Sequence, residues 1–455
     1  MNHMALFFLM LFVAGSYGWA VRGTTLGKET GAMLPGALLG ILCAWFSGSA
    51  LLWENLWIFC AAGALGMFVG GTETYGETIG FVVAAKPPDP RRGYGGLALK
   101  GLLWFGIAGA FLGISFTAVT GNTYTIRDFI WLFAPMPLIW AAGVAVLNSP
   151  FCPKEGKFPK IYFSQTRKEV WGGMVAMLLT LLIFMLVKKD HFALYLCIGG
   201  AVGGALGWVL GMWFFRLTVH PMRNGKQLFG RLQPMLEGWK LMENTLGAAG
   251  FLGIGAGFAL GYPHLQAIIA AVERTGGLWN PLGEHAELLS WGMLLLITVG
   301  ELLLAGVYQF WLKKTKVGEA YLSLVHKSLY TYLSLPLVYL GALRYARLVS
   351  VFLIYLALAI KMLGGGKAKR KASLAYKIPI VLSSIALLFA EILWGGRFTA
   401  LSPWLLYTLV YFGFEFLRTM AFNAQQKKQH ASKLTVEAFK ALGIAALWMF
   451  AYNFF

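Results

Sequence analysis

Long runs of apolar residues, separated by short polar segments, follow one another along the whole chain. Many of these runs approach the length that a helix needs to cross a bilayer, and no polar segment is long enough for a separate soluble domain. The pattern predicts an all-α polytopic integral membrane protein in which residues 1–455 form a single integral-membrane domain. We expect about 14 transmembrane helices, at residues 4–20, 31–51, 56–71, 98–119, 128–147, 169–186, 192–215, 244–262, 288–312, 329–342, 348–362, 378–393, 402–417 and 438–451.

Positive charge is concentrated in every second loop between these predicted spans. Because cytoplasmic loops carry the excess of Lys and Arg in membrane proteins, these loops are predicted to be cytoplasmic. The net charge of +19 therefore indicates topology, and no nucleic-acid recognition motif accompanies it. The alternation predicts that both termini lie outside, and we expect the membrane to be a bacterial cytoplasmic membrane.

Two segments rich in glycine and threonine place charged residues at the ends of apolar runs. Residues 23–30 read GTTLGKET and residues 71–78 read GTETYGET. Charge in or near a bilayer is costly, so it usually lines a cavity or pairs with a partner. We therefore expect both segments to contribute to one binding site, although each could instead be an ordinary solvated loop at a helix end.

The first segment suggests a site for an anionic group. Arg22 would hold that group, and the free N–H groups of a glycine-rich helix start would favour it further. The pair Asn244 and Thr245 is expected to act in the same way, with Asn244 as the N-cap of the span that follows. The residues predicted to bind substrate are Arg22, Thr24, Thr25, Gly27, Lys28, Thr72, Asn244 and Thr245.

Four carboxylates are candidates for ion coupling. Glu73 and Glu77 would share one face of a helix. Two carboxylates in a low dielectric favour a shared proton, and the neighbouring threonine hydroxyls could help to hold Na⁺. Glu301 falls within the predicted span 288–312, where a carboxylate is either functional or a structural hydrogen-bond acceptor. The ion-coupling residues are predicted to be Glu29, Glu73, Glu77 and Glu301.

A weak internal similarity suggests two related halves. Gly18-Trp19 with Thr25-Leu26-Gly27 matches Gly238-Trp239 with Thr245-Leu246-Gly247. The hypothesis is that residues 1–215 and 238–455 form parallel-related bundles, joined by the basic cytoplasmic loop 216–237. A chance match is the alternative in a chain with 56 glycines.

The glycines themselves allow two interpretations. Their spacing predicts faces on which helices approach closely, at residues 36–40, 66–70, 200–211 and 247–261. They would also permit broken or re-entrant helices, and residues 71–85 are the best candidate for such an element.

These observations favour a secondary-active transporter of a small polar, anionic solute, coupled to H⁺ or Na⁺. The alternatives are a membrane-embedded transferase acting on a lipid-linked or acyl substrate, and a structural subunit of a larger complex. No phosphate-binding loop, catalytic triad pattern or metal-ligand spacing occurs, so we predict no catalytic residue, metal or cofactor. The expected partners are the transported solute or ion and the lipid bilayer.

Overall fold

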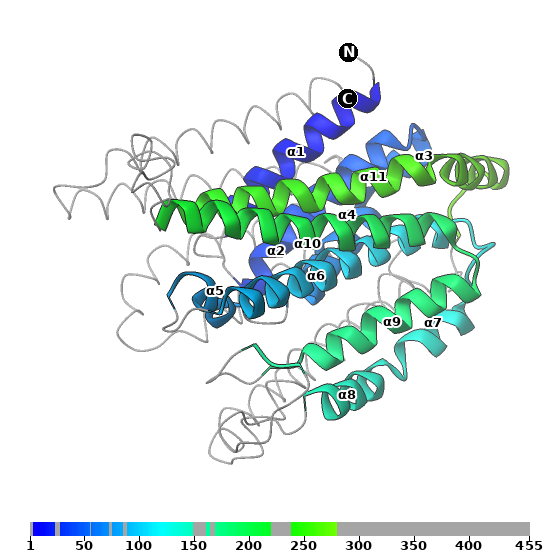
Figure 1. The fold of residues 1–455 in the computed structure, drawn as a ribbon. Coiled ribbons are helices and arrows are strands. Elements are labelled where there is room, and N and C mark those ends of the chain that lie inside the picture. The colour runs from blue at the N-terminus through cyan, green and yellow to red at the C-terminus, as the bar shows by residue number, and fades with distance from the viewer. Residues whose placement is uncertain are drawn as a thin grey trace, which may run out of the picture.

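The computed structural model describes residues 3–22, 28–54, 56–71, 75–84, 89–148, 161–163, 169–219 and 238–279 (Figure 1). Within these ranges the fold is all-helical and contains no strand. The helices are α1 (His3–Arg22), α2 (Lys28–Phe46), α3 (Ala50–Glu54), α4 (Leu56–Gly70), α5 (Gly76–Val83), α6 (Pro90–Ala118), α7 (Ile126–Phe133), α8 (Met136–Leu147), α9 (Trp171–Val187), α10 (His191–Val219) and α11 (Gly238–Thr275).

The predicted helical class is confirmed. Each predicted span up to 244–262 overlaps one or two helices, and the ranges from 288 onward lie outside the described residues. Four stretches are long and apolar enough to cross a membrane: Pro90–Ala118, Ile126–Leu147, His191–Val219 and Gly238–Thr275. The protein is therefore assigned to a membrane, while the count of about 14 spans stays a prediction.

Several boundaries differ from those predicted, because polar residues open some helices. Helix α6 begins at Pro90, well before the predicted 98, with Asp89 as its N-cap accepting from the Arg92 backbone N–H at 3.2 Å. Proline at the first helical position and an acidic cap are favourable there. The predicted span 128–147 is interrupted between α7 and α8, where Pro135 precedes the first residue of α8.

Helix α10 lies between α6 and α11, and glycines line both contacts. A β-carbon added at Gly203 would lie 2.5 Å from the Ala249 carbonyl oxygen of α11. One added at Gly204 would lie 2.2 Å from the Gly101 oxygen of α6. Only glycine permits such close approach of two backbones, so these faces fix the spacing of the three helices.

The same device joins α2 to α4 and α1 to α11. Gly36 of α2 faces Gly63 of α4, where an added β-carbon would lie 2.2 Å from the Gly63 oxygen. Gly15 of α1 meets Gly247 of α11 in the same way, at 2.3 Å. The predicted role of the glycine runs in close helix packing is therefore confirmed for residues 36–40, 200–211 and 247–261.

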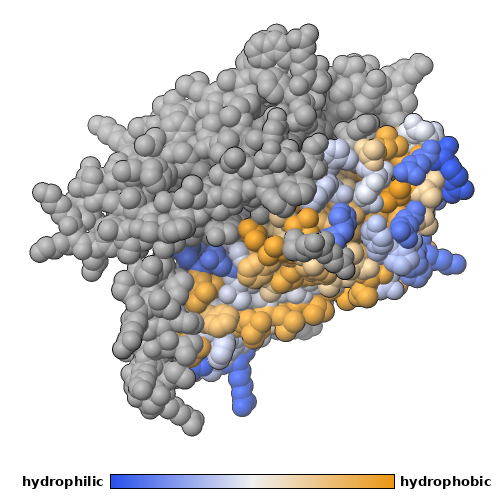
Figure 2. Space-filling model, turned by 90° about the horizontal axis from the view of Figure 1, so that it is seen from above, coloured by the Kyte–Doolittle hydropathy of each residue, from blue (hydrophilic) through white to orange (hydrophobic). Residues whose placement is uncertain are grey.

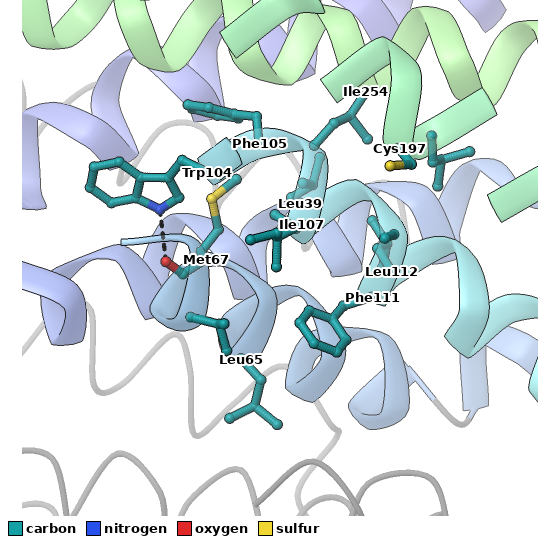
Figure 3. Close-up of a cluster of buried hydrophobic side chains, with 14 of the residues drawn as sticks. Leu39, Leu65, Met67, Trp104, Phe105, Ile107, Phe111, Leu112, Cys197 and Ile254 are labelled. Carbon is teal, nitrogen blue, oxygen red and sulfur yellow. Dashed lines mark hydrogen bonds between the residues drawn. The ribbon is translucent and has the colours of Figure 1, made fainter. Parts of the chain in front are cut away.

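Large apolar side chains fill the centre of this bundle. The cluster in Figure 3 draws on α2, α4, α6, α10 and α11, and its members include Leu39, Leu65, Ile107, Cys197 and Ile254. Outside the bundle, α7, α8 and α9 leave other apolar side chains exposed, as a lipid-facing surface requires. The space-filling view shows hydrophobic side chains over much of the described surface, with hydrophilic ones gathered toward its edges (Figure 2).

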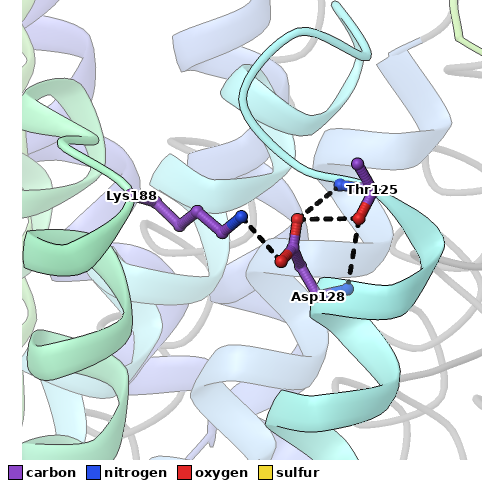
Figure 4. A network of polar contacts seen from close by, with 3 residues as sticks. All are labelled: Thr125, Asp128 and Lys188. Atoms are coloured by element: carbon purple, nitrogen blue, oxygen red, sulfur yellow. Dashed lines mark hydrogen bonds and ion pairs between the residues drawn. The ribbon is translucent and has the colours of Figure 1, made fainter.

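Short polar turns gather at one end of the bundle. The Trp279 backbone N–H donates to the Val119 oxygen at 2.9 Å, so the turns after α6 and α11 lie together. The capping box of α7, formed by Thr125 and Asp128, receives Lys188 at 2.6 Å from Asp128 Oδ1 (Figure 4).

Asp190 joins three elements at this same end. Its carboxylate accepts from the hydroxyls of Thr117 and Tyr124, each at 2.5 Å, and from the Ala193 backbone N–H at 2.9 Å. The side chain is 3% exposed. Burial raises the pKa of the Asp190 carboxyl, although the hydrogen bonds from Thr117, Tyr124 and Ala193 act in the opposite direction.

Replacing Asp190 by alanine should lower the free energy of unfolding by about 2–4 kcal/mol, because the buried Tyr124 hydroxyl and the Ala193 N–H lose the carboxylate as an acceptor, whereas the Thr117 hydroxyl keeps the Gly113 and Ile114 oxygens. Asp190→Asn is the matched control, since its amide oxygen can still cap α10.

The raised pKa of the Asp190 carboxyl in the folded protein also makes stability depend on pH. The protonated carboxyl contributes stability at low pH, and this contribution is lost as the pH rises above the ordinary pKa of 3.8. The thermal midpoint of the wild type should therefore fall relative to that of Asp190→Asn as the pH increases. Thermal unfolding in detergent between pH 4 and 8 measures both effects, and equal midpoints for Asp190→Ala and wild type would contradict the first.

Candidate functional site at the break between helices α4 and α5

Helices α4 and α5 follow one another along α6. Helix α4 ends at Gly70, and α5 begins at Gly76 and continues in the same direction. Both run antiparallel to α6, as their contacts show in order along the chain: Gly66 meets Ala108, Gly70 meets Trp104, Thr78 meets Gly96, and Val82 meets Gly93. The two helices therefore form one path with a break in it, a broken helix, and α5 does not turn back as a re-entrant element would.

The lengths agree with this description. Helix α4 has 15 residues, which rise ~22 Å and fall short of the ~30 Å hydrocarbon core. Helix α5 adds 8 residues, or ~12 Å. Neither helix alone spans a bilayer, whereas the pair covers that distance alongside α6. The GTETYGET segment, identified from sequence as a site candidate, lies at this break.

Lys100 of α6 lies at the level of the break and is fully buried, with 0% of its surface exposed. Its Nζ donates to the Gly70 carbonyl oxygen at 3.3 Å. The ammonium also lies over two indole rings, 4.4 Å from the centroid of Trp104 and 6.0 Å from that of Trp171. Ten residues of α6 separate it from the start of that helix at Pro90, which is ~15 Å of helix.

The end of α4 stabilises this charge. The last carbonyl groups of a helix carry a partial negative charge, and an ammonium placed against them is favoured. Indole faces add a cation–π attraction that is stronger away from water. Trp104 is held in position by its Nε1–H, which donates to the Met67 oxygen at 2.7 Å (Figure 3). These contacts offset a desolvation cost that amounts to several kcal/mol for a buried ion.

A buried carboxylate also contacts Trp171. Glu169 precedes α9 and is 1% exposed. Its Oε2 accepts from the Phe163 backbone N–H at 2.6 Å and from the Trp171 Nε1–H at 2.8 Å. Trp171 therefore contacts both a buried base and a buried acid. An acid and a base buried around one side chain are a common feature of sites that move ions or charged solutes.

Two further polar groups near the break are buried without a hydrogen-bond partner in the described part of the chain: the Thr78 hydroxyl and the Trp208 Nε1–H. Thr78 is 1% exposed and belongs to α5, and Trp208 of α10 packs against Tyr75 with ring centroids 4.7 Å apart. Buried polar groups are nearly always satisfied in folded proteins. These two groups beside the break are therefore available to hydrogen-bond a water or a polar solute.

The structure describes only part of the predicted site. Thr24, Thr25, Gly27, Thr72, Glu73 and Glu301 lie outside the described residues. Arg22 ends α1 and Lys28 and Glu29 open α2, but their side chains are not among those described. Glu77 is described, half-buried in the first turn of α5 and directly beside the break. Among the predicted coupling residues, Glu77 is thus the one that the described structure brings to the Lys100 region.

Asn244 and Thr245 occupy a different setting from the predicted one. Helix α11 begins at Gly238, so the prediction that Asn244 is its N-cap is wrong, and its N–H lies within the helix. The Thr245 hydroxyl donates to the Leu241 oxygen of its own helix at 2.8 Å. The Asn244 backbone carbonyl oxygen accepts from the Ser16 hydroxyl of α1 at 3.4 Å, whereas its side-chain Oδ1 is buried without a hydrogen-bond partner in the described part of the chain. Their role in substrate binding stays a prediction. The argument from free N–H groups at a helix start no longer supports it, because both residues lie inside α11.

The internal similarity also falls on unlike structures. Gly18-Trp19 lies near the end of α1, whereas Gly238-Trp239 opens α11. Residues 25–27, the rest of the first copy, are outside the described residues. The hypothesis of two halves concerns mainly residues beyond 279, which are not described, and it stays a prediction.

Sequence reasoning missed Lys100 and Glu169 as site residues. Lys100 stands near the start of an apolar run, where a lysine ordinarily extends toward the membrane surface. One signal was available, because Gly96, Lys100 and Trp104 recur at every fourth position and so share one face of α6. That spacing indicates a face able to receive another element, but not which element fills it.

Among the residues that the structure describes, no group of three or more His, Cys, Asp or Glu side chains could hold a metal ion. Comparison with models of protein families, with curated proteins and with solved structures finds no match. The class of the protein therefore rests on its own geometry: the described part is all-helical, four stretches are apolar enough to cross a membrane, and a buried lysine lies at the break between the shorter helices α4 and α5.

Proposed function

We propose that the protein is a secondary-active transporter of a small polar, anionic solute, coupled to H⁺ or Na⁺, in a bacterial cytoplasmic membrane. The observation that carries this proposal is the fully buried Lys100 at the break between α4 and α5. A charged side chain inside a membrane bundle is costly and is by default functional. Discontinuous helices with ion or solute sites at their broken ends are a recurrent feature of secondary transporters.

The residues divide between two roles in this proposal. Lys100 supplies the positive charge that attracts the anionic group, and the Thr78 hydroxyl and Trp208 Nε1–H offer uncharged hydrogen bonds beside it. Glu77 lies at the same break and takes part in ion coupling. The remaining proposed substrate residues are those named from the sequence, led by Arg22 and Lys28. The remaining coupling residues are Glu29, Glu73 and Glu301.

Uptake into proteoliposomes tests the proposal. The full chain is reconstituted, and accumulation of labelled acetate, succinate, phosphate or glutamate is followed under an inward H⁺ or Na⁺ gradient. We expect at least one solute to accumulate, and Lys100→Met to lower its initial rate at least tenfold, equivalent to about 1.4 kcal/mol. Lys188→Met is the matched control, because Lys188 pairs with Asp128 at the opposite end of the bundle.

The proposal is contradicted if Lys100→Met transports as fast as the wild type. It is equally contradicted if no solute of the panel accumulates under either gradient while the purified protein remains folded. A transferase or a structural subunit would give that second result, because neither needs a solute path that couples to an ion gradient.

A further inference from the structure

We propose that Lys100 itself carries the coupling ion as the proton of its ammonium group, so that transport is driven by H⁺ and needs no Na⁺. The inference rests on the proposed function and deepens it, since it names the coupling ion and the atom that binds it. Three observations carry it: the occupancy of the last carbonyl groups of α4, the complete burial of Nζ, and the surrounding titratable groups.

The carbonyl end of a broken helix is the place where a transporter of this plan binds Na⁺. In this protein, donors of the chain itself already bind three of the last four carbonyl oxygens of α4. The Met67 oxygen accepts from Trp104 Nε1 at 2.7 Å, and the Phe68 oxygen accepts from the Gly71 backbone N–H at 3.2 Å. The Gly70 oxygen accepts from Lys100 Nζ at 3.3 Å. The lysine ammonium thus stands where a metal cation would bind.

A built-in cation can act as a coupling ion only if its charge can be removed, and a lysine allows this. In the proposed cycle, Nζ takes one proton from the water on one side of the membrane, and the anion binds beside the resulting ammonium. On the other side, the ammonium gives that proton to water and keeps the electron pair of the broken N–H bond. One H⁺ and one anionic group therefore cross together.

The titratable groups around Lys100 affect how readily its Nζ gains and loses a proton. The titratable groups of the described residues at the break include Glu169 before α9, Glu77 in α5, and Tyr75 between α4 and α5. Tyr94 lies on α6 itself, with its hydroxyl buried and without a hydrogen-bond partner there. Binding of the anion and binding of the proton at Nζ favour each other, and this mutual effect is the thermodynamic basis of coupling.

The test compares ions and uses a variant that keeps the charge but cannot lose it. Uptake of the solute that the wild type accumulates is measured with an H⁺ gradient in choline buffer, and with a Na⁺ gradient at equal pH on both sides. We expect accumulation in the first case and a change of less than twofold when Na⁺ replaces choline. Lys100→Arg should lower H⁺-driven accumulation at least tenfold, because a guanidinium does not deprotonate in proteins. Solute exchange without a gradient should persist in that variant at a reduced rate.

A second readout needs no solute and does not depend on the variant folding. The thermal midpoint of the wild-type protein in detergent is measured in NaCl and in choline chloride at equal ionic strength, and we expect no difference. A midpoint raised specifically by Na⁺, uptake that requires Na⁺, or wild-type accumulation by Lys100→Arg would each overturn the inference and leave the transporter proposal intact. Absence of uptake under both gradients would instead contradict the proposed function, and the inference with it.

Discussion

Replacing Gly109 of α6 by valine should prevent the chain from folding. A β-carbon at this position would lie 2.2 Å from the Leu196 carbonyl oxygen and 2.7 Å from its carbonyl carbon, both in the backbone of α10. No side-chain rotation can relieve that overlap, so α6 and α10 would have to separate along their whole contact. Overpacking of this kind costs about 1–3 kcal/mol where side chains can shift, and more where the backbone itself must move.

Gly95 of the same helix provides the matched control. A β-carbon at Gly95 meets nothing within 4 Å, so Gly95→Val should fold as well as the wild type. Valine also has a higher helix propensity than glycine, which favours the variant slightly. Fluorescence-detected size-exclusion chromatography and thermal unfolding in detergent measure the pair. Equal elution profiles and midpoints for Gly109→Val and Gly95→Val would show that the glycine faces do not set the helix spacing.

Reversing the charge at position 100 is the second change with a large expected effect. In Lys100→Glu, a carboxylate would face the Gly70 carbonyl oxygen and the negative end of α4, with the buried Glu169 in the same cluster. A buried charge left without compensation costs about 3–5 kcal/mol, and a carboxylate at this place would in addition be repelled by the carbonyl oxygens at the end of α4. We expect Lys100→Glu to yield no folded protein.

Lys100→Met separates this electrostatic effect from packing. Methionine keeps an unbranched side chain against Trp104 and loses the hydrogen bond to Gly70, at a cost of about 1–3 kcal/mol. The variant should therefore fold with a lowered thermal midpoint and should lose transport. If Lys100→Glu and Lys100→Met gave equal yields and equal thermal midpoints, the assignment of a stabilised ammonium at the end of α4 would be contradicted.

Much of the fold could be predicted from the sequence, because apolar runs and glycine spacing act locally. The apolar runs that form α1, α2, α4, α9 and α10 predict helices without knowledge of the neighbouring elements. The boundaries of α6 and α11 could not be found in this way, since both helices open with polar turns outside the apolar run. Asn244 looked like an N-cap for that reason, although α11 had already begun at Gly238.

The candidate site could be predicted only in part. The segment GTETYGET is visible because charged and hydroxyl side chains stand at the end of an apolar run, and it does lie at the break between α4 and α5. Lys100 and Glu169 could not be assigned to it, because their burial depends on packing between segments far apart in the sequence. The contact of Lys100 with Gly70 and Trp171 exists only once α4, α6 and the segment before α9 are assembled.

The most direct test of the central claim is a structure of the protein in lipid nanodiscs with the accumulated solute bound. The proposed function predicts solute density at the break between α4 and α5, with its anionic group within hydrogen-bond distance of Lys100 Nζ and near the Thr78 hydroxyl. Solute density bound elsewhere, with Lys100 still enclosed by Gly70, Trp104 and Trp171, would contradict it.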